Sequence, residues 1–267
     1  MNKLPKSPLV TRHTEDGVLT ITLSSTEPGH PLTVAMTEAL ASAFEDAAHQ
    51  PGVHCVLLQS EGRHFCSGGN VKDMRDGADL MQGSVDEVRE RLRNSLHRIP
   101  LAIRNIEVPV IAAVQGAAVG AGCDLALMCD IRIAASDARF AESFLRIGLV
   151  SGIGGSWFLT RIVGLSKALE MTFTSEFLDA EAALRCGIVS EIVPRERLHI
   201  TAAALALRIA SNPPTALRMA KKLVREAAAS SLEATLETAA SMQSVLLCGE
   251  EHKQQVARFL DGQAIRA

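Results

Sequence analysis

Hydrophobic positions in the first sixty residues alternate with polar ones or run together, as they do in β-strands. Residues 18–24 (VLTITLS) alternate, and residues 53–60 (VHCVLLQS) form a more continuous apolar run that is typical of a deeply buried strand. Between them, residues 34–50 place apolar side chains at helical spacing. The chain is therefore predicted to begin with a strand, a helix and a second strand.

The same alternation of strands and helices continues in the middle of the chain. A strand, a short helix and another strand are predicted at residues 109–116, 120–130 and 131–136. Upstream of them, Ser84 and Glu87 have the spacing of a capping box, which predicts a helix running towards Asn105. Parallel strands joined by helices are the arrangement that this order favours, so the fold class is α/β.

The last seventy residues are predicted to be helical throughout. They are rich in Ala and Leu and are interrupted at Pro213 and Pro214. This stretch is too short and open to form a core of its own, so we expect it to pack on the rest of the chain or on another subunit. The expected organisation is a core of residues 1–195 followed by a helical region of residues 196–267.

Composition and charge exclude several classes of protein. The 267 residues are 47% hydrophobic, and 27 basic residues nearly balance 30 acidic ones, so no basic surface for nucleic acid or an anionic membrane is expected. The six cysteines include no paired CxxC, which favours reduced, buried thiols over disulfides or a zinc site. No apolar run approaches the ~20 residues of a membrane span, and no export signal is evident, so a cytoplasmic protein is expected.

Two glycine-rich loops follow predicted strands and carry the main candidate chemistry. The first is residues 62–74, and the second, residues 116–124, opens the predicted apolar helix. Unpaired backbone N–H groups at such turns and at a helix N-terminus stabilise developing negative charge, so one donor from each loop would form an oxyanion hole. For either loop alone, tight turns and close packing are the simpler explanation.

Other polar groups offer weaker signals. His64 and Ser67 lie in one loop without a GxSxG elbow, so His64 is interpreted as a structural or rim residue and not as part of a nucleophilic triad. Lys221, Lys222 and Arg225 form a charge run on a predicted helix, which is typical of a solvated face.

Taken together, the loops resemble the crotonase superfamily, also called the enoyl-CoA hydratase/isomerase family. The segment GRHFCSGGNVKDM (62–74) is similar to the family pattern F-[SC]-x-G-x-D-[LIV]-x-x-M, with Asn70 in place of the Asp. Residues 108–164, from VPVIAAVQG to LTRIVG, follow the longest family signature almost position by position. The resemblance extends from about Gly17 to the last helix.

This resemblance implies a fold, a substrate and an assembly. The fold would be a crotonase-like spiral of ββα units with a C-terminal helical oligomerisation region that supports homotrimers, commonly paired into hexamers. The substrate would be an acyl-CoA, and no separate cofactor is implied because coenzyme A is part of the substrate. The oxyanion donors would be the N–H groups of Gly69 and Ala121. The residues expected to line the coenzyme A and acyl path are Cys66, Ser67, Gly68, Val71, Phe144, Gly152 and Ile153.

The catalytic acids are where the sequence departs from the family. Typical hydratases carry two glutamates, and the matching positions here hold Asp124 and Phe144. We expect Asp124 to be the acid/base, with a pKa raised by apolar neighbours, although an acid in a first helical turn also stabilises the helix dipole. Glu142 lies two residues before Phe144 and could swing in to replace the missing second acid, but a surface charge on the loop is the favoured explanation for it.

A single acid favours a double-bond shift, because one base can remove a proton at one carbon and return it at another. The resemblance therefore implies hydration or, preferentially, isomerisation of an unsaturated acyl-CoA. A catalytically weak acyl-CoA-binding homologue, and a CoA-thioester hydrolase or decarboxylase on the same scaffold, are the alternatives.

Overall fold

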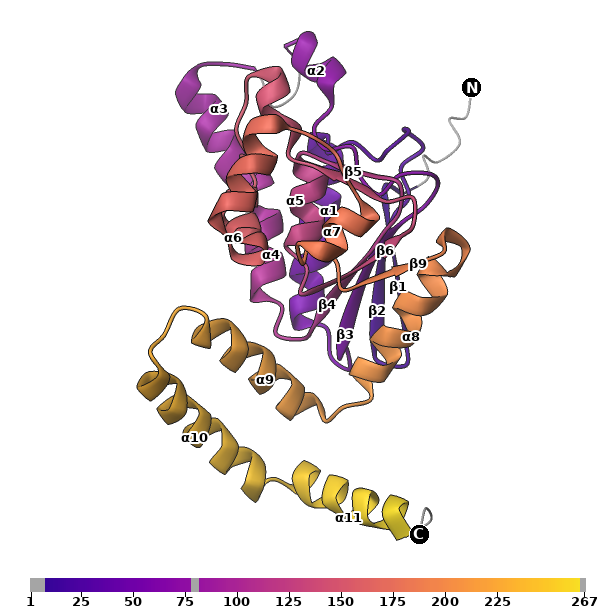
Figure 1. Ribbon diagram of the computed structural model, residues 1–267, viewed down its shortest axis with the longest axis vertical. Helices are drawn as coiled ribbons and strands as arrows, with labels where there is room; N and C mark the ends of the chain where they lie inside the picture. The colour runs from indigo at the N-terminus through magenta and orange to yellow at the C-terminus, as the bar shows by residue number, and fades with distance from the viewer. Residues whose placement is uncertain (1–7, 78–81, 265–267) are drawn as a thin grey trace.

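The structure is a computed structural model that describes residues 8–77 and 82–264, and its centre is a six-stranded sheet (Figure 1). In spatial order its strands are β1 (Val10–Glu15), β2 (Val18–Leu23), β3 (Cys55–Ser60), β4 (Val110–Val114), β6 (Ile131–Ala135) and β9 (Glu191–Val193). Only the β1–β2 pair is antiparallel, and the other neighbouring strands are parallel. A second sheet contains β5 (Ala117–Val119), β7 (Arg139–Ala141) and β8 (Leu178–Asp179).

Helices connect the strands and then continue alone to the C-terminus. The helices up to the end of the sheet are α1 (Val34–His49), α2 (Val71–Arg75), α3 (Val85–Arg91), α4 (Arg98–Asn105), α5 (Ala121–Leu127), α6 (Gly155–Thr174) and α7 (Ala180–Arg185). A π-helical turn, η2 (Leu92–Leu96), precedes α4, and the 3-10 turns η3 (Ser143–Ile147) and η4 (Arg195–Arg197) follow β7 and β9. The last four helices are α8 (Leu198–Ala210), α9 (Pro214–Ala227), α10 (Leu232–Cys248) and α11 (Glu250–Ala264).

The hydrophobic pattern of the strands is explained by burial on both faces of the large sheet. In β3, Val56 and Leu58 belong to the core cluster that includes α1, whereas Cys55 and Leu57 belong to the cluster that includes α8. A strand covered on both sides needs apolar residues at successive positions, which is why residues 53–60 read as a continuous run.

Most of the predicted elements are confirmed. The five predicted strands and helices up to residue 130, together with the strand at 131–136, correspond to β2, α1, β3, β4, α5 and β6. The capping box is present, since Ser84 N–H donates to Glu87 Oε2 at 2.7 Å and Glu87 N–H donates to Ser84 Oγ. The helix that it opens reaches Asn105 only through the π-helical turn that separates α3 from α4.

The α/β class and the helical C-terminal region are confirmed. Figure 1 shows α9, α10 and α11 running away from the body of the molecule, whereas α8 lies across the sheet. Ala202 and Ala206 of α8 are fully buried in the cluster on that face. The division into residues 1–195 and 196–267 stays a prediction.

One prediction about side chains is wrong, and the prediction of free, buried cysteines fails only in the burial of two of them. The charge run on α9 is not a solvated face, because the Lys221 side chain is only 7% exposed and its ammonium group lies 2.7 Å from Asp130. Arg225 binds the same carboxylate at 2.7 Å, while Lys222 is exposed. Four cysteines are buried as free thiols, but Cys186 is half-buried and Cys248 is exposed.

Neither a membrane span nor a metal cluster is found in the described ranges. No helix there is long and apolar enough to cross a membrane. No group of three or more His, Cys, Asp or Glu side chains is placed to hold a metal ion among those residues.

Candidate active site

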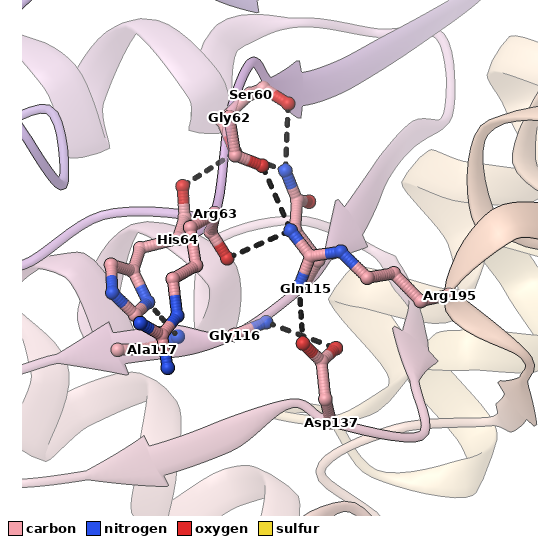
Figure 2. A network of polar contacts seen from close by, with 9 residues as sticks. All are labelled: Ser60, Gly62, Arg63, His64, Gln115, Gly116, Ala117, Asp137 and Arg195. Atoms are coloured by element: carbon pink, nitrogen blue, oxygen red, sulfur yellow. Dashed lines mark hydrogen bonds and ion pairs between the residues drawn. The ribbon is translucent and has the colours of Figure 1, made fainter.

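The first glycine-rich loop leaves β3 and is fixed at its beginning by Arg195 (Figure 2). The guanidinium of Arg195 donates to the carbonyls of Gly62 and Arg63 at 2.9 and 3.0 Å and also pairs with Asp137. A planar guanidinium can hold several acceptors at once in a fixed geometry. The start of this loop is therefore tied to η4, which is more than 130 residues away in the chain.

His64 is a structural residue, as predicted. Its Nδ1 atom accepts a hydrogen bond of 3.1 Å from the Ala117 N–H, and its carbonyl accepts one of 3.1 Å from the Ser60 hydroxyl (Figure 2). Partial burial, followed by the charges of Arg63 and Arg195, lowers the pKa of His64. A neutral ring keeps Nδ1 available as an acceptor, so His64 joins the first loop to β5.

The second loop turns sharply between β5 and α5. Gly120 has φ 52° and ψ −122°, a conformation that a residue with a Cβ rarely adopts, and its N–H donates to the Ala141 carbonyl at 2.8 Å. Ala121 is the first residue of α5, so its N–H has no carbonyl partner within the helix. This places an orphan donor at the positive end of the helix dipole.

Glycines allow the two loops to pack backbone against backbone. A Cβ on Gly68 would lie 2.5 Å from the Val119 carbonyl oxygen and 3.2 Å from the Ala121 nitrogen. A Cβ on Gly122 would overlap the Cys66 carbonyl, which accepts a hydrogen bond of 3.0 Å from Val119 N–H. Close packing, the simpler explanation of these glycines, is therefore correct, and it brings the segment containing Gly69 beside Ala121.

The hydrogen bonds of the described residues leave the Gly69 N–H without an acceptor. Close behind it lies Met74, whose methyl carbon would be 2.5 Å from a Cβ at Gly69. Asn70 accepts a hydrogen bond of 3.1 Å from Lys72 N–H and so caps α2. This Asn shapes the turn that follows Gly69, in line with a structural role for the replaced Asp.

The other predicted lining residues differ widely in accessibility. Ser67 and Val71 are exposed, Val71 at 58%, whereas Cys66 and Ile153 are buried. Burial raises the pKa of the Cys66 thiol to about 12, so it stays neutral. Gly152 is half-buried, and its carbonyl lies 3.0 Å from the His97 ring. Their contacts with coenzyme A stay predictions.

Phe144 lies next to the turn that begins α5. It belongs to η3, and its ring carbon Cζ would be 3.6 Å from a Cβ at Gly120. The ring is partly buried. The position at which the resemblance places a second glutamate is thus filled by an aromatic ring beside the predicted oxyanion donor Ala121.

Asp124 is completely buried in the first turn of α5. Its Oδ2 atom accepts a hydrogen bond of 2.7 Å from the Ser151 hydroxyl, and that hydroxyl accepts one of 2.8 Å from Gly155 N–H. A side chain at Gly155 would collide with the carboxyl group. Burial, and then the charge of Glu142, raises the pKa of Asp124 well above its usual value.

Glu142 is not a surface charge, so that interpretation is wrong. It is 3% exposed, and burial raises its pKa. The reason is local, since Glu142 directly follows β7, which pairs with β5. Phe140, Ala141 and Glu142 are all buried, so the chain leaves β7 in the interior, beside the start of α5.

Two further residues lie at Asp124: Ser151, which was not predicted to belong to the site, and Glu142, for which a surface position was favoured over a replacement of the second acid. Glu142 lies just after a three-residue strand, which is too short for a convincing alternation, so no pattern in the sequence predicts its burial. Ser151 precedes a glycine-rich segment and carries no signal of its own.

Comparisons with known proteins agree with this architecture. The family model described as enoyl-CoA hydratase/isomerase matches residues 13–264. The chain is 32% identical over 248 residues to 1,2-epoxyphenylacetyl-CoA isomerase of Escherichia coli K12, covering 93% of this chain and 94% of the relative. It is 35% identical over 246 residues to a protein named probable enoyl-CoA hydratase of Rhodobacter capsulatus, covering 92% of each. The crystal structure of enoyl-CoA hydratase from Mycobacterium smegmatis superimposes with a TM-score of 0.87 at 32% identity, covering 96% of this chain and 97% of that one.

A family match over nearly the whole length, relatives above 30% identity and the same fold lead to one conclusion. The chain belongs to the enoyl-CoA hydratase/isomerase family, the crotonase superfamily.

Proposed function

We propose that the protein shifts the double bond of an unsaturated acyl-CoA in preference to hydrating it. The observation that carries this proposal is the Phe144 ring beside Gly120, in the place where a hydratase of this family would hold its second glutamate. Hydration needs a positioned, activated water, whereas isomerisation benefits when water that would intercept the enolate is excluded. An aromatic ring at this position favours the second chemistry.

In this proposal the thioester carbonyl accepts hydrogen bonds from the N–H groups of Gly69 and Ala121. Both donors lack partners within the described residues, and the second lies at a helix N-terminus. A preorganised donor of this kind contributes about 3–4 kcal/mol to lowering the barrier. The negative charge of the enolate would then develop where backbone dipoles already point.

Asp124 is proposed to move the proton. Its carboxylate takes a proton from C2 of a 3-enoyl-CoA, so that the C2–H bond breaks, an O–H bond forms and the electron pair moves onto the thioester oxygen. The same proton then bonds to C4 while the double bond forms between C2 and C3. A general base is most effective when its pKa lies near the pH at which the enzyme works. The raised pKa of Asp124 brings this carboxyl group closer to that pH.

The relatives are compatible with either chemistry. One of them is named an isomerase and another a hydratase. The test is therefore a direct comparison in wild-type protein of kcat/KM for isomerisation of a 3-enoyl-CoA and for hydration of the matching 2-enoyl-CoA. We expect isomerisation to be the faster reaction. Efficient hydration without detectable isomerisation would overturn the proposal.

A catalytically weak acyl-CoA-binding protein is the second candidate, and the complete burial of Asp124 favours it. The acyl chain can reach this carboxyl only if covering groups such as Ser151 move aside.

Deuterium exchange into an acyl-CoA in heavy water separates the candidates. We expect Asp124→Asn to reduce exchange by about 10²- to 10⁴-fold and to leave coenzyme A binding within a few fold, because it removes the base while nearly preserving shape. Equal exchange by both proteins would support the binding protein, and release of free coenzyme A would point to a hydrolase.

A further inference from the structure

Two carboxyl side chains meet in the interior at the start of α5. Asp124 has no exposed surface, and Glu142 is only 3% exposed. The pairing of β5 with β7 brings them together, because Gly120 and Ala141 are joined by a 2.8 Å hydrogen bond and each directly precedes the segment that carries one of the acids. Each presents a buried oxygen, Asp124 Oδ1 and Glu142 Oε1, that has no hydrogen-bond partner among the described residues.

A hydrogen bond between these two oxygens would give each of them a partner, and it requires a proton. A carboxylate has only acceptor oxygens, so a hydrogen bond between the two exists only if one of them is protonated. Two adjacent carboxylates shielded from water also repel each other strongly enough that both do not ionise in the same pH range.

The remaining neighbours do not neutralise the pair with a positive charge. Ser151 donates a hydrogen bond to Asp124, and Cys123 contacts Glu142 with a thiol whose pKa is raised by burial and by the two acids. The His97 ring contacts the Gly152 carbonyl next to Ser151 and does not touch either carboxyl. Among the described residues, no lysine or arginine shifts the pKa of Asp124 or Glu142.

We propose that Asp124 and Glu142 share a single proton and act as one acid–base unit, in which Glu142 is a positioning residue that sets the protonation state of Asp124. The inference rests on the proposed role of Asp124 and goes beyond it, because it assigns a function to a residue outside the expected pair of acids. The singly protonated unit carries one negative charge and can accept the proton released from C2. It becomes neutral as the enolate forms and regains its negative charge when the proton moves to C4.

The pair predicts a specific dependence of the reaction on pH. The doubly protonated unit has no base, so the rate falls in acid. The doubly ionised unit places a second negative charge beside the developing enolate, so the rate also falls in alkali. In Glu142→Gln the second charge is gone, and the rate of proton exchange should rise with pH to a plateau through one ionisation.

The titration itself can be observed without any substrate. Protein labelled with ¹³C at the Asp and Glu carboxyl carbons is titrated by NMR, with Asp124→Asn and Glu142→Gln identifying the two signals. In wild type we expect both signals to follow the same two steps, the behaviour of a coupled pair. In Glu142→Gln we expect the Asp124 signal to show one step. Its midpoint should lie about one pH unit or more below the upper wild-type step, because the neighbouring charge is absent.

The exposed acid Glu176 provides the matched control, since Glu176→Gln should leave the Asp124 signal and the rate profile unchanged. A single Asp124 step with the same midpoint in wild type and Glu142→Gln would overturn the shared proton. If Glu142→Gln does not fold, the wild-type titration decides, because independent one-step curves contradict the pair. A coupled titration without turnover of any enoyl-CoA would instead refute the proposed function and leave the proton-sharing pair intact.

Discussion

At the scale of single residues, the acids that serve the proposed chemistry lower the stability of the fold. The pKa of Asp124 is raised in the folded chain, mainly by burial, so between the unfolded and folded pKa values the native state binds more protons than the unfolded state. Stability contributed by the protonated form is fully present below the unfolded pKa of about 4 and is lost as pH rises through the folded pKa. The wild-type free energy of unfolding should therefore decline on the alkaline side of about pH 4.

Asp124→Asn removes the part of this decline that comes from Asp124. The amide can still accept from Ser151 and can donate to Glu142 without ionising, so we expect the variant to be more stable than wild type by roughly 1–3 kcal/mol at pH 8. The difference should vanish near pH 4. Urea unfolding across this range measures it, with Asp261→Asn on the exposed surface of α11 as the control. A constant difference at all pH values would mean that the effect comes from packing and not from the proton.

Some side-chain environments at the site could be predicted from the sequence, and others could not. The burial of Asp124 beside apolar neighbours was predictable, since it lies in an apolar helix directly after a glycine-rich turn. The inward direction of Glu142 was not, because it depends on the pairing of two three-residue strands, which leave almost no periodic signal. The buried ion pair of Lys221 was missed for a related reason: its partner Asp130 is distant in the chain, and helical periodicity alone does not reveal it.

At the scale of elements, the strands and helices with clear periodicity were predicted, and those without it were not. The strand β1 has mostly polar, exposed residues and owes its conformation to antiparallel pairing with β2. Without a buried face it has no hydrophobic alternation to recognise. The long helix α6 follows glycine-rich Gly152–Gly155 and contains Gly164 in a non-helical conformation, so its pattern is interrupted as well.

The helix α9 is joined to the core by charges, and this attachment can be tested. Lys221 lies 2.7 Å from Asp130 and also donates to the Val108 carbonyl at 2.6 Å, whereas Lys222 on the same helix is 64% exposed. We expect Lys221→Met to lower the free energy of unfolding by roughly 1–3 kcal/mol. This is less than the ~3–5 kcal/mol of a fully buried pair, because Arg225 still neutralises Asp130.

Lys222→Met is the matched control on the next residue, and we expect it to change stability by less than about 0.5 kcal/mol. Both variants keep helix propensity and side-chain length similar, so denaturant unfolding compares the two environments directly. Equal effects of the two substitutions would show that the Asp130 contact does not hold α9 in place.

At the scale of the whole molecule, the C-terminal helices expose many large apolar side chains. Among the described residues beyond α8, those more than half exposed are Val224, Leu232, Leu236, Val245, Leu247, Phe259 and Leu260. These helices project from the body and have few partners within the chain (Figure 1). Apolar side chains that gather on the surface mark interfaces between proteins, and identical chains most often cover such interfaces by closed symmetry.

Because the family resemblance implies that the C-terminal helices support trimers, we predict that the protein is a homotrimer or a hexamer in solution. Light scattering at micromolar concentration should give three or six times the 28.5 kDa mass of the chain. Replacing Leu236 and Phe259 together by glutamate should shift the mass towards monomer, because burying two unpaired charges in an apolar interface costs more than the lost contacts return. The paired control is Ser230→Glu with Gln254→Glu, which adds the same two charges at exposed positions without removing apolar surface. A wild-type monomer at these concentrations would refute the assembly, and the apolar faces of α10 and α11 would then require a different partner.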